Sequence, residues 1–251
     1  MASAQTGNKS TFKLLALLEA FSPQKPWISI SELAEMLELP RVSLYRLVNP
    51  LVEKGFLQHD PEAKRYAPGV AFFRLGQTAL HTLHFSQALP GVLDEIARLV
   101  PHTITVSVLR GRHVVYIDKR ESTAGLKVGA DVGALLPLHH GGSGKLFLAH
   151  MDRDKAAAIL ETAKNDPDSV LSPAALDALF LQLPAIRKQG HIILPGETIE
   201  GLMSVAVPIF AHDGSMDAGI SILIPTPLCT ENELARCLGI LTAACAKLSF
   251  I

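Results

Sequence analysis

The sequence predicts an α+β protein of two domains, and three observations lead to this prediction. Two short amphipathic helical segments meet at a tight break between Ser29 and Leu57, and a polar turn and a basic segment follow them. A further helical stretch covers about 70–83. From residue 86 onward, helical segments separate segments of alternating polarity, which indicates an antiparallel sheet packed against helices.

The first domain opens with a helix predicted over about 11–20, and the helix pair follows it. Ser29 and Glu32 have the spacing of a capping box, in which a hydroxyl and a carboxylate satisfy free amides at a helix start. We therefore expect a helix to begin near Ile30. Pro40 cannot continue this helix, but it suits the first turn of the next one.

The second helix of the pair has a polar and partly basic outer face. Its apolar residues recur with a period near 3.6, and a second set of residues falls outside them: Arg41, Ser43, Tyr45 and Arg46. Pro50 lies inside the same helix, where a proline removes a backbone hydrogen bond. We expect the helix either to bend there or to end near Val48.

A small hairpin follows the helix pair. A polar turn beginning at Asp60 and the basic residues Lys64 and Arg65 predict a basic return strand. Helix pair and hairpin together predict a winged helix-turn-helix over residues 1–69, which could place its second helix in a DNA major groove. The alternative is an ordinary helical hairpin whose charges are only solvated.

The second domain is predicted over residues 86–251, and a linker helix over 70–85 joins it to the first. A strand with strict alternation at 102–109 and a second strand at 114–117 predict an antiparallel hairpin. The remaining elements are helices over about 143–160 and 173–189, strands near 191, 203–210 and 216–224, and a last helix to about 249 that a capping box of Thr230 and Glu233 opens.

Composition sets limits on the class of protein. With 48% hydrophobic and 19% charged residues the chain is globular, and its net charge of −1 means that any basic surface is local. No apolar run approaches the roughly 18 residues of a membrane span, and the N-terminus lacks a signal-peptide core, so we expect a cytoplasmic protein without a membrane partner. Three cysteines with no zinc spacing predict reduced thiols and neither metal nor cofactor: Cys229, Cys237 and Cys245.

The glycine-rich segment 139–145 invites enzymatic interpretations, and its spacing argues against each of them. A phosphate-binding loop needs glycine where His139 stands and a hydroxyl where Leu146 stands. A nucleophile elbow around Ser143 would need a second glycine where Lys145 stands. Two adjacent histidines point in different directions, and no further ligand has a helpful spacing. We therefore expect no enzyme.

Two interpretations of this segment stay open from the residues alone. Gly141 to Gly144 opens a helix, and free amides at a helix start attract anions such as a carboxylate. The alternative is a glycine-rich turn that only lets helix and sheet pack closely.

Over nearly its whole length the chain resembles the IclR-type bacterial transcriptional regulators. In the first domain the matching residues are 33–34, 39–41, Ser43, 46–47, 51–52, 54–56, Asp60, Tyr66 and Gly69. In the second domain they are 114–118, 137–139, 144–145, 148–149, Gly190, 200–201 and 205–208.

The resemblance implies that the second domain is a GAF/PAS-like effector-binding module. The residues that match the family's pocket are Val128, Leu136, Gly142, Ser143, Leu194, Ser204, Ser221 and Leu223. Family members often have an acid where Leu194 stands, a cysteine at Ser204 and a serine at Leu223, so this pocket is more apolar. We expect a small organic acid with an apolar or aromatic body as the effector.

The leading hypothesis is a DNA-binding transcriptional regulator, either repressor or activator, whose operator affinity the effector modulates. It would act as a homo-oligomer, a dimer or a tetramer, on a roughly palindromic operator of double-stranded DNA. The expected DNA contacts are Arg41, Ser43, Tyr45, Arg46, Lys64 and Arg65. One alternative is a small-molecule enzyme whose winged helix serves protein contacts. Another is a winged helix that serves oligomerisation without DNA affinity.

Overall fold

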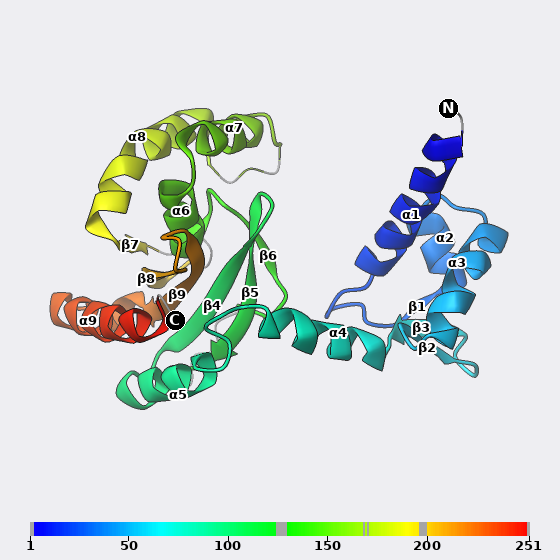
Figure 1. Cartoon of the computed structure of the whole chain (residues 1–251), viewed down its shortest axis with the longest axis horizontal. Coiled ribbons are helices and arrows are strands. Elements are labelled where there is room, and N and C mark those ends of the chain that lie inside the picture. The colour runs from blue at the N-terminus through cyan, green and yellow to red at the C-terminus, as the bar shows by residue number, and fades with distance from the viewer. Residues whose placement is uncertain (1–2, 124–129, 168, 170, 196–199, 250–251) are drawn as a thin grey trace. The chain divides into compact units, whose positions relative to one another are not determined.

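The computed structural model describes residues 3–123, 130–167, 169, 171–195 and 200–249 (Figure 1). The chain divides into two compact units, Met1–Leu83 and His84–Ile251, and each is described here by itself. The division places helix α4 (Val70–His81) with the first unit, so a separate linker over 70–85 stays a prediction. None of the described helices is long and apolar enough to cross a membrane.

The first unit is a helical core with a small antiparallel sheet. Its other helices are α1 (Ser3–Glu19), α2 (Ile30–Met36) and α3 (Arg41–Glu53), so α1 begins earlier than the predicted residue 11. The strands are β1 (Ile28–Ser29), β2 (Leu57–Asp60) and β3 (Arg65–Pro68), in the order β1–β3–β2. The most deeply buried side chains of its core are at most 2% exposed: Leu17, Ile28, Leu33, Leu44, Val48 and Leu57.

The predicted start of α2 is confirmed. Ser29 Oγ accepts a hydrogen bond from the Glu32 amide at 3.3 Å, and Glu32 Oε2 accepts one from the Ser29 amide at 2.8 Å. The hydrogen bond that the Ser29 amide donates is also the largest of the causes that lower the pKa of Glu32 from 4.5 to about 2. Both halves of the capping box are therefore formed.

Helix α3 continues through Pro50 to Glu53, so the expectation that it could end near Val48 is wrong. Pro50 has no amide hydrogen to donate to the preceding turn. The last turn nevertheless carries Leu51 and Val52, which pack against the same core as the fully buried Val48. Burial of these apolar side chains offsets the missing hydrogen bond.

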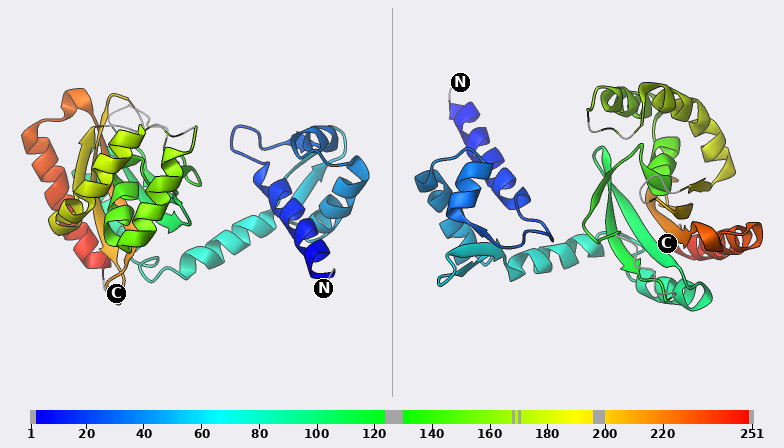
Figure 2. Two further views of the ribbon diagram at one scale, coloured as in Figure 1. Left: turned by 90° about the horizontal axis from the view of Figure 1, so that it is seen from above. Right: turned by 180° about the vertical axis from the view of Figure 1, so that it is seen from behind.

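The second unit contains a six-stranded antiparallel sheet in the order β6–β5–β4–β9–β8–β7. Helices α6, α7 and α8 lie on one face of this sheet, and α5 and α9 lie on the other (Figures 1 and 2). The strands are β4 (Thr103–Arg110), β5 (His113–Arg120), β6 (Leu135–Pro137), β7 (Ile192–Pro195), β8 (Leu202–Phe210) and β9 (Met216–Pro225). The helices are α5 (Leu89–Leu99), α6 (Gly141–His150), α7 (Arg153–Lys164), α8 (Pro173–Gln189) and α9 (Glu231–Leu248).

The helix predicted over 143–160 is two helices, α6 and α7. Asp152 separates them, because its carboxylate accepts hydrogen bonds from the amides of Asp154 and Lys155 and so caps a new helix start. The prediction for α8 is confirmed: Ser172 caps its start, and Gly190 ends it with a φ of +69°. The short strand β6 was not predicted.

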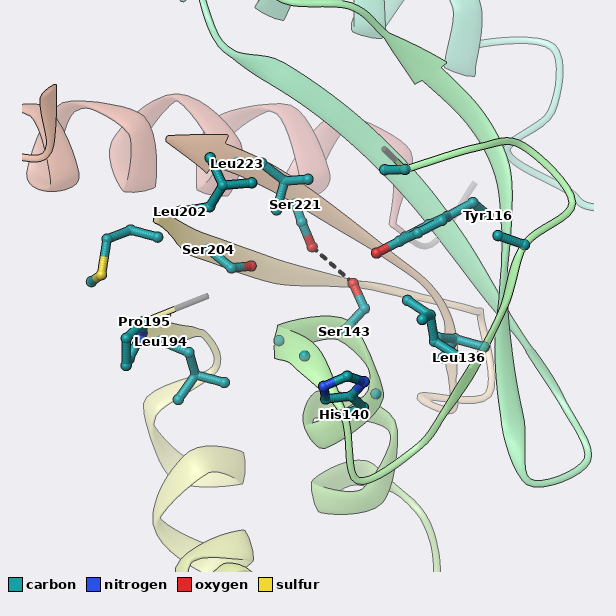
Figure 3. A pocket seen from close by; sticks show the side chains of 17 residues that line it. Tyr116, Leu136, His140, Ser143, Leu194, Pro195, Leu202, Ser204, Ser221 and Leu223 are labelled. Carbon is teal, nitrogen blue, oxygen red and sulfur yellow. Dashed lines mark hydrogen bonds between the residues drawn. The ribbon is translucent and has the colours of Figure 1, made fainter. Parts of the chain in front are cut away.

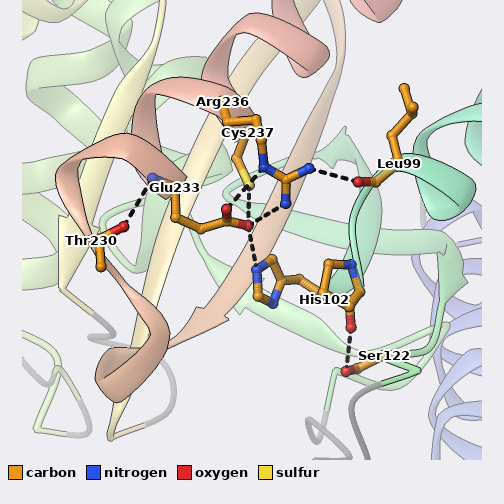
Figure 4. A network of polar contacts seen from close by, with 8 residues as sticks. Leu99, His102, Ser122, Thr230, Glu233, Arg236 and Cys237 are labelled. Atoms are coloured by element: carbon orange, nitrogen blue, oxygen red, sulfur yellow. Dashed lines mark hydrogen bonds and ion pairs between the residues drawn. The ribbon is translucent and has the colours of Figure 1, made fainter.

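At the start of α9 only half of the predicted capping box forms. Thr230 Oγ1 accepts a hydrogen bond from the Glu233 amide at 3.1 Å, but the Glu233 carboxylate does not return it. Instead, Glu233 Oε1 lies 2.8 Å from His102 Nε2 and accepts a hydrogen bond from Arg236 (Figure 4). Arg236 also donates to the carbonyl oxygen of Leu99 at 2.7 Å. This network ties α9 to the end of α5 and the start of β4.

Candidate DNA-binding surface and effector pocket

The first candidate surface is the outer face of α3. Arg41, Tyr45 and Arg46 are exposed there and Ser43 is half-buried, while Leu44 on the same helix is fully buried. The amphipathic pattern therefore positions the predicted DNA contacts toward solvent, where a major groove could receive them. That these side chains contact DNA stays a prediction.

The hairpin of β2 and β3 carries the other two predicted contacts. Lys64 is exposed at the turn, with a φ of +51°, and no ion pair involves it within the described residues. Arg65 is held in place from two sides. Its guanidinium lies 5.7 Å from the ring centroid of Trp27, and its Nη2 lies 3.9 Å from Asp60 Oδ2. Lys64 is thus the freer of the two cations.

The second candidate site is a cavity of about 60 Å³ between the start of α6 and the sheet (Figure 3). Seven of the eight predicted pocket residues line it together, although they come from five different elements: Leu136, Gly142, Ser143, Leu194, Ser204, Ser221 and Leu223. Val128, the eighth, lies outside the described residues.

One end of the cavity is polar. Ser143 Oγ and Ser221 Oγ are hydrogen-bonded at 2.8 Å, and Figure 3 shows the Tyr116 hydroxyl directed toward them. Burial raises the pKa of Tyr116 to about 12, so its hydroxyl stays a donor at neutral pH. The cap residue of α6, His140, supplies no side-chain acceptor for the first amides of the helix. These groups together could donate hydrogen bonds to an anion.

The other end of the cavity is apolar, and strand register explains why. Leu194 on β7 pairs with Ser204 on β8, and Ser204 pairs with Leu223 on β9, so the three form one row across the sheet. Paired residues lie on the same face of a sheet, so the two leucines flank the serine on the cavity side. Leu202 adds to this apolar end.

Several lining residues were not predicted, among them Tyr116, His140 and Leu202. Tyr116 belongs to the matched segment 114–118, but alternation along a strand does not say which face of the sheet will carry a cavity. His140 was considered only as a metal ligand. The signal that could have found Tyr116 is its place on the same strand face as the buried Val114.

The hydroxyl of Ser143 has the hydroxyl of Ser221 as its partner rather than an imidazole. A nucleophilic serine needs a base within hydrogen-bond reach, and a second serine does not supply one. This geometry agrees with a binding role for Ser143.

A further cluster contains three potential metal ligands, His102 Nε2, Glu233 Oε1 and Cys237 Sγ, all within 4.8 Å of one another. Arg236 donates hydrogen bonds to both carboxylate oxygens of Glu233 and would compete with a cation for them. Burial raises the pKa of the Cys237 thiol to about 12, which disfavours the thiolate that a metal requires. We interpret the cluster as a structural ion-pair network.

A winged helix-turn-helix and a separate unit with a small-molecule cavity are the organisation of a ligand-responsive DNA-binding protein. Comparison with known families agrees with this class. The model of the IclR helix-turn-helix domain matches residues 10–61, and the model of the bacterial transcriptional regulator IclR C-terminal domain matches residues 77–250. The chain therefore belongs to the IclR family of transcriptional regulators, and it is a regulator rather than an enzyme.

Named relatives cover almost the whole chain. The transcriptional regulator KdgR of Escherichia coli is 29% identical over 240 residues, which are 96% of this chain and 91% of KdgR. KipR of Bacillus subtilis is 28% identical over 232 residues, 92% of this chain and 91% of KipR. A crystal structure of a putative IclR regulator from Silicibacter has a TM-score of 0.81 at 26% identity and covers 96% of this chain and 94% of its own.

An IclR homolog from Microbacterium hydrocarbonoxydans, solved in complex with 4-hydroxybenzoate, has the same TM-score of 0.81. It is 21% identical and covers 96% of this chain and 97% of its own. At that identity the likeness concerns the fold. The predicted α+β fold, with its N-terminal helix-turn-helix and its C-terminal antiparallel sheet domain, is confirmed.

Proposed function

We propose that this regulator binds operator DNA through α3 and the hairpin of β2 and β3. We further propose that a small organic acid in the cavity beside Ser143 alters the affinity for DNA. One observation carries the effector half of the proposal. Residues from six elements converge on a single cavity that has hydroxyl groups and helix-start amides at one end and leucines at the other. Such a site suits a ligand with an anionic end and an apolar body.

The anionic group would lie against the first turn of α6. The amides there carry the positive end of the helix dipole, and Ser143 and Ser221 can turn their hydroxyl hydrogens toward a carboxylate. Their present hydrogen bond to each other would be exchanged for bonds to the ligand. The carboxylate would thus replace an existing polar contact without leaving a buried hydroxyl unpaired.

The apolar body would lie against Leu136, Leu194 and Leu223. The cavity of about 60 Å³ is smaller than the roughly 150 Å³ of an apolar cavity that holds benzene, so a ring needs side chains to move. Leu194 and Leu223 are only half-buried and can move outward. An aromatic acid is also what the Microbacterium relative holds in its crystal structure, and this supports the same ligand class here.

We also propose that the protein acts as a homo-oligomer on a roughly palindromic operator. Helix α4 exposes Val70, Phe73 and Leu75 by 72%, 68% and 52%. Large exposed apolar side chains on one helix are typical of an interaction surface, and a second copy of the chain would cover them. Light scattering of wild type and Phe73→Glu tests this, because the variant should shift toward monomer.

The main experiment measures fluorescence anisotropy of DNA from upstream of the coding sequence, with and without benzoate and benzamide. Arg46→Met should weaken binding by about 5- to 150-fold, the cost of a lost base-reading arginine. Arg98→Met is the matched control, because Arg98 is exposed on α5 in the other unit. Benzoate should change the DNA affinity and benzamide should not. Equal effects of acid and amide would contradict the carboxylate, and equal binding by the two variants would contradict the α3 contact.

A further inference from the structure

A second cavity lies in the C-terminal unit among α6, α7 and α8, and it shares no lining residue with the effector pocket. Its volume is about 270 Å³. Because an apolar cavity of about 150 Å³ already holds benzene, this groove has room for one or two rings. Its apolar lining includes Leu148, Ala156, Phe180 and Leu183.

Two arginines from different helices line the same groove. Arg153 begins α7 and Arg187 lies in the last turn of α8, and both are exposed. Neither makes an ion pair with any residue in the described ranges. The Arg153 guanidinium lies 4.8 Å from the centroid of the Phe180 ring, so an aromatic face and a cation stand together at the groove.

Within the described residues, the acidic residue that lines the groove forms no ion pair with either arginine, and the two cations outnumber it. Asp152 Oδ1 accepts hydrogen bonds from the amides of Asp154 and Lys155 at 3.0 and 3.1 Å, which commits it to the start of α7. The positive charge also affects the pKa of a neighbouring histidine, His150. Burial lowers the pKa of His150, and the charge of Arg187 lowers it further. The groove is therefore apolar inside and positively charged at its edge.

We propose that this groove is a second ligand site, which takes small organic anions with an apolar body. The anionic group would pair with Arg153 and Arg187, and the body would lie on Phe180 and Leu183. Small molecules fit better than a protein segment, because the apolar volume is that of one or two rings and the charges stand at its edge. An aryl carboxylate satisfies both features.

Two methionines allow the two sites to be observed separately. Met151 lines the groove and Met203 lines the effector pocket. The full chain carrying carbon-13 methyl-labelled methionine is titrated with naphthoate, with Met151→Leu and Met203→Leu assigning the two methyl resonances. The Met151 resonance should shift in a saturable manner. Naphthamide, which lacks the charge, should leave it in place.

The matched variants are Arg187→Met and Lys188→Met, because Lys188 is exposed on the same helix and does not line the groove. Arg187→Met should raise the half-saturation of the Met151 shift about tenfold, the effect of losing one charge-assisted hydrogen bond. Lys188→Met should change it less than about twofold. Equal curves for both variants, or equal binding of acid and amide, would overturn the proposal. A shift of Met203 alone would also overturn it, whereas a shift of Met151 alone supports it and leaves the single-ring effector pocket to be tested by the benzoate experiment.

Discussion

The polar network at the start of α9 predicts that Glu233 gives the C-terminal unit an acid-sensitive stability. Hydrogen bonds from Arg236, and then the contact with His102, lower the pKa of Glu233 from 4.5 to about 2. The Glu233 side chain is only 19% exposed and that of His102 only 2%. The charged carboxylate is therefore specifically stabilised in the folded state.

The magnitude follows from this difference in pKa. A carboxyl group with a pKa of about 2 when folded and 4.5 when unfolded contributes at most about 3 kcal/mol at neutral pH. Because the Arg236 side chain is 44% exposed, solvent screening reduces this to about 1–2 kcal/mol. The folded pKa is the lower one, so the contribution is fully present above pH 4.5 and disappears as the pH falls toward 2.

The test is Glu233→Gln, which keeps the amide that Thr230 caps but removes the charge. Urea unfolding followed by circular dichroism should show a loss of about 1–2 kcal/mol at neutral pH, and about half of that near pH 3. The chain has a single tryptophan, Trp27 in the first unit, so a transition without a change in its fluorescence belongs to the second unit. Glu231→Gln is the control, because Glu231 is exposed in the same first turn. The reasoning is refuted by a loss that does not change with pH, or by an equal loss in the control.

Two further predictions concern the first unit. Pro50→Ala should restore a hydrogen bond in α3 and so raise the free energy of unfolding of the first unit by about 2 kcal/mol. Urea unfolding followed by Trp27 fluorescence measures this change. An unchanged midpoint would show that the last turn of α3 does not need this hydrogen bond. Lys64→Met should make DNA binding less sensitive to salt: in a plot of the logarithm of DNA affinity against the logarithm of salt concentration, the magnitude of the slope should fall by about one. Fluorescence anisotropy measures the affinities. An unchanged slope would exclude Lys64 as a phosphate contact.

Two capping boxes with the same residue spacing show what a local sequence pattern can predict and what it cannot. Ser29 and Glu32 form both hydrogen bonds, because the nearby Lys25 pairs with Glu32 Oε1 at 2.9 Å, whereas the Ser29 amide donates to the other carboxylate oxygen, Oε2. At Thr230 only one bond forms, because the Glu233 carboxylate accepts from Arg236 and contacts His102, which is 131 residues away in sequence. Local spacing predicts a helix start in both cases. It cannot reveal a competing partner that only the tertiary fold supplies.

The same distinction applies to the cavity. Apart from β6, the strands and the start of α6 followed from alternation and from the glycines, but their convergence on one cavity followed only from the resemblance to a family. Tyr116 was missed because the sequence does not say which face of β5 meets α6. Helix α3 shows most clearly that tertiary packing can override a local sequence rule, because burial of the residues after Pro50 keeps the helix intact.

Strand register finally constrains how an effector would lie. Ser221 pairs with Ala206, two residues along β8 from Ser204, and Ser204 stands in the row between Leu194 and Leu223. The polar and apolar rows are therefore about 7 Å apart along the strand, which is close to the length of a benzoate. A carboxylate at Ser143 and Ser221 thus places a single ring on the two leucines. A para-hydroxyl on that ring would find Ser204 between them, so Ser204→Ala should weaken 4-hydroxybenzoate about tenfold and leave benzoate unchanged in a thermal-shift titration. Equal weakening of both acids would contradict this orientation.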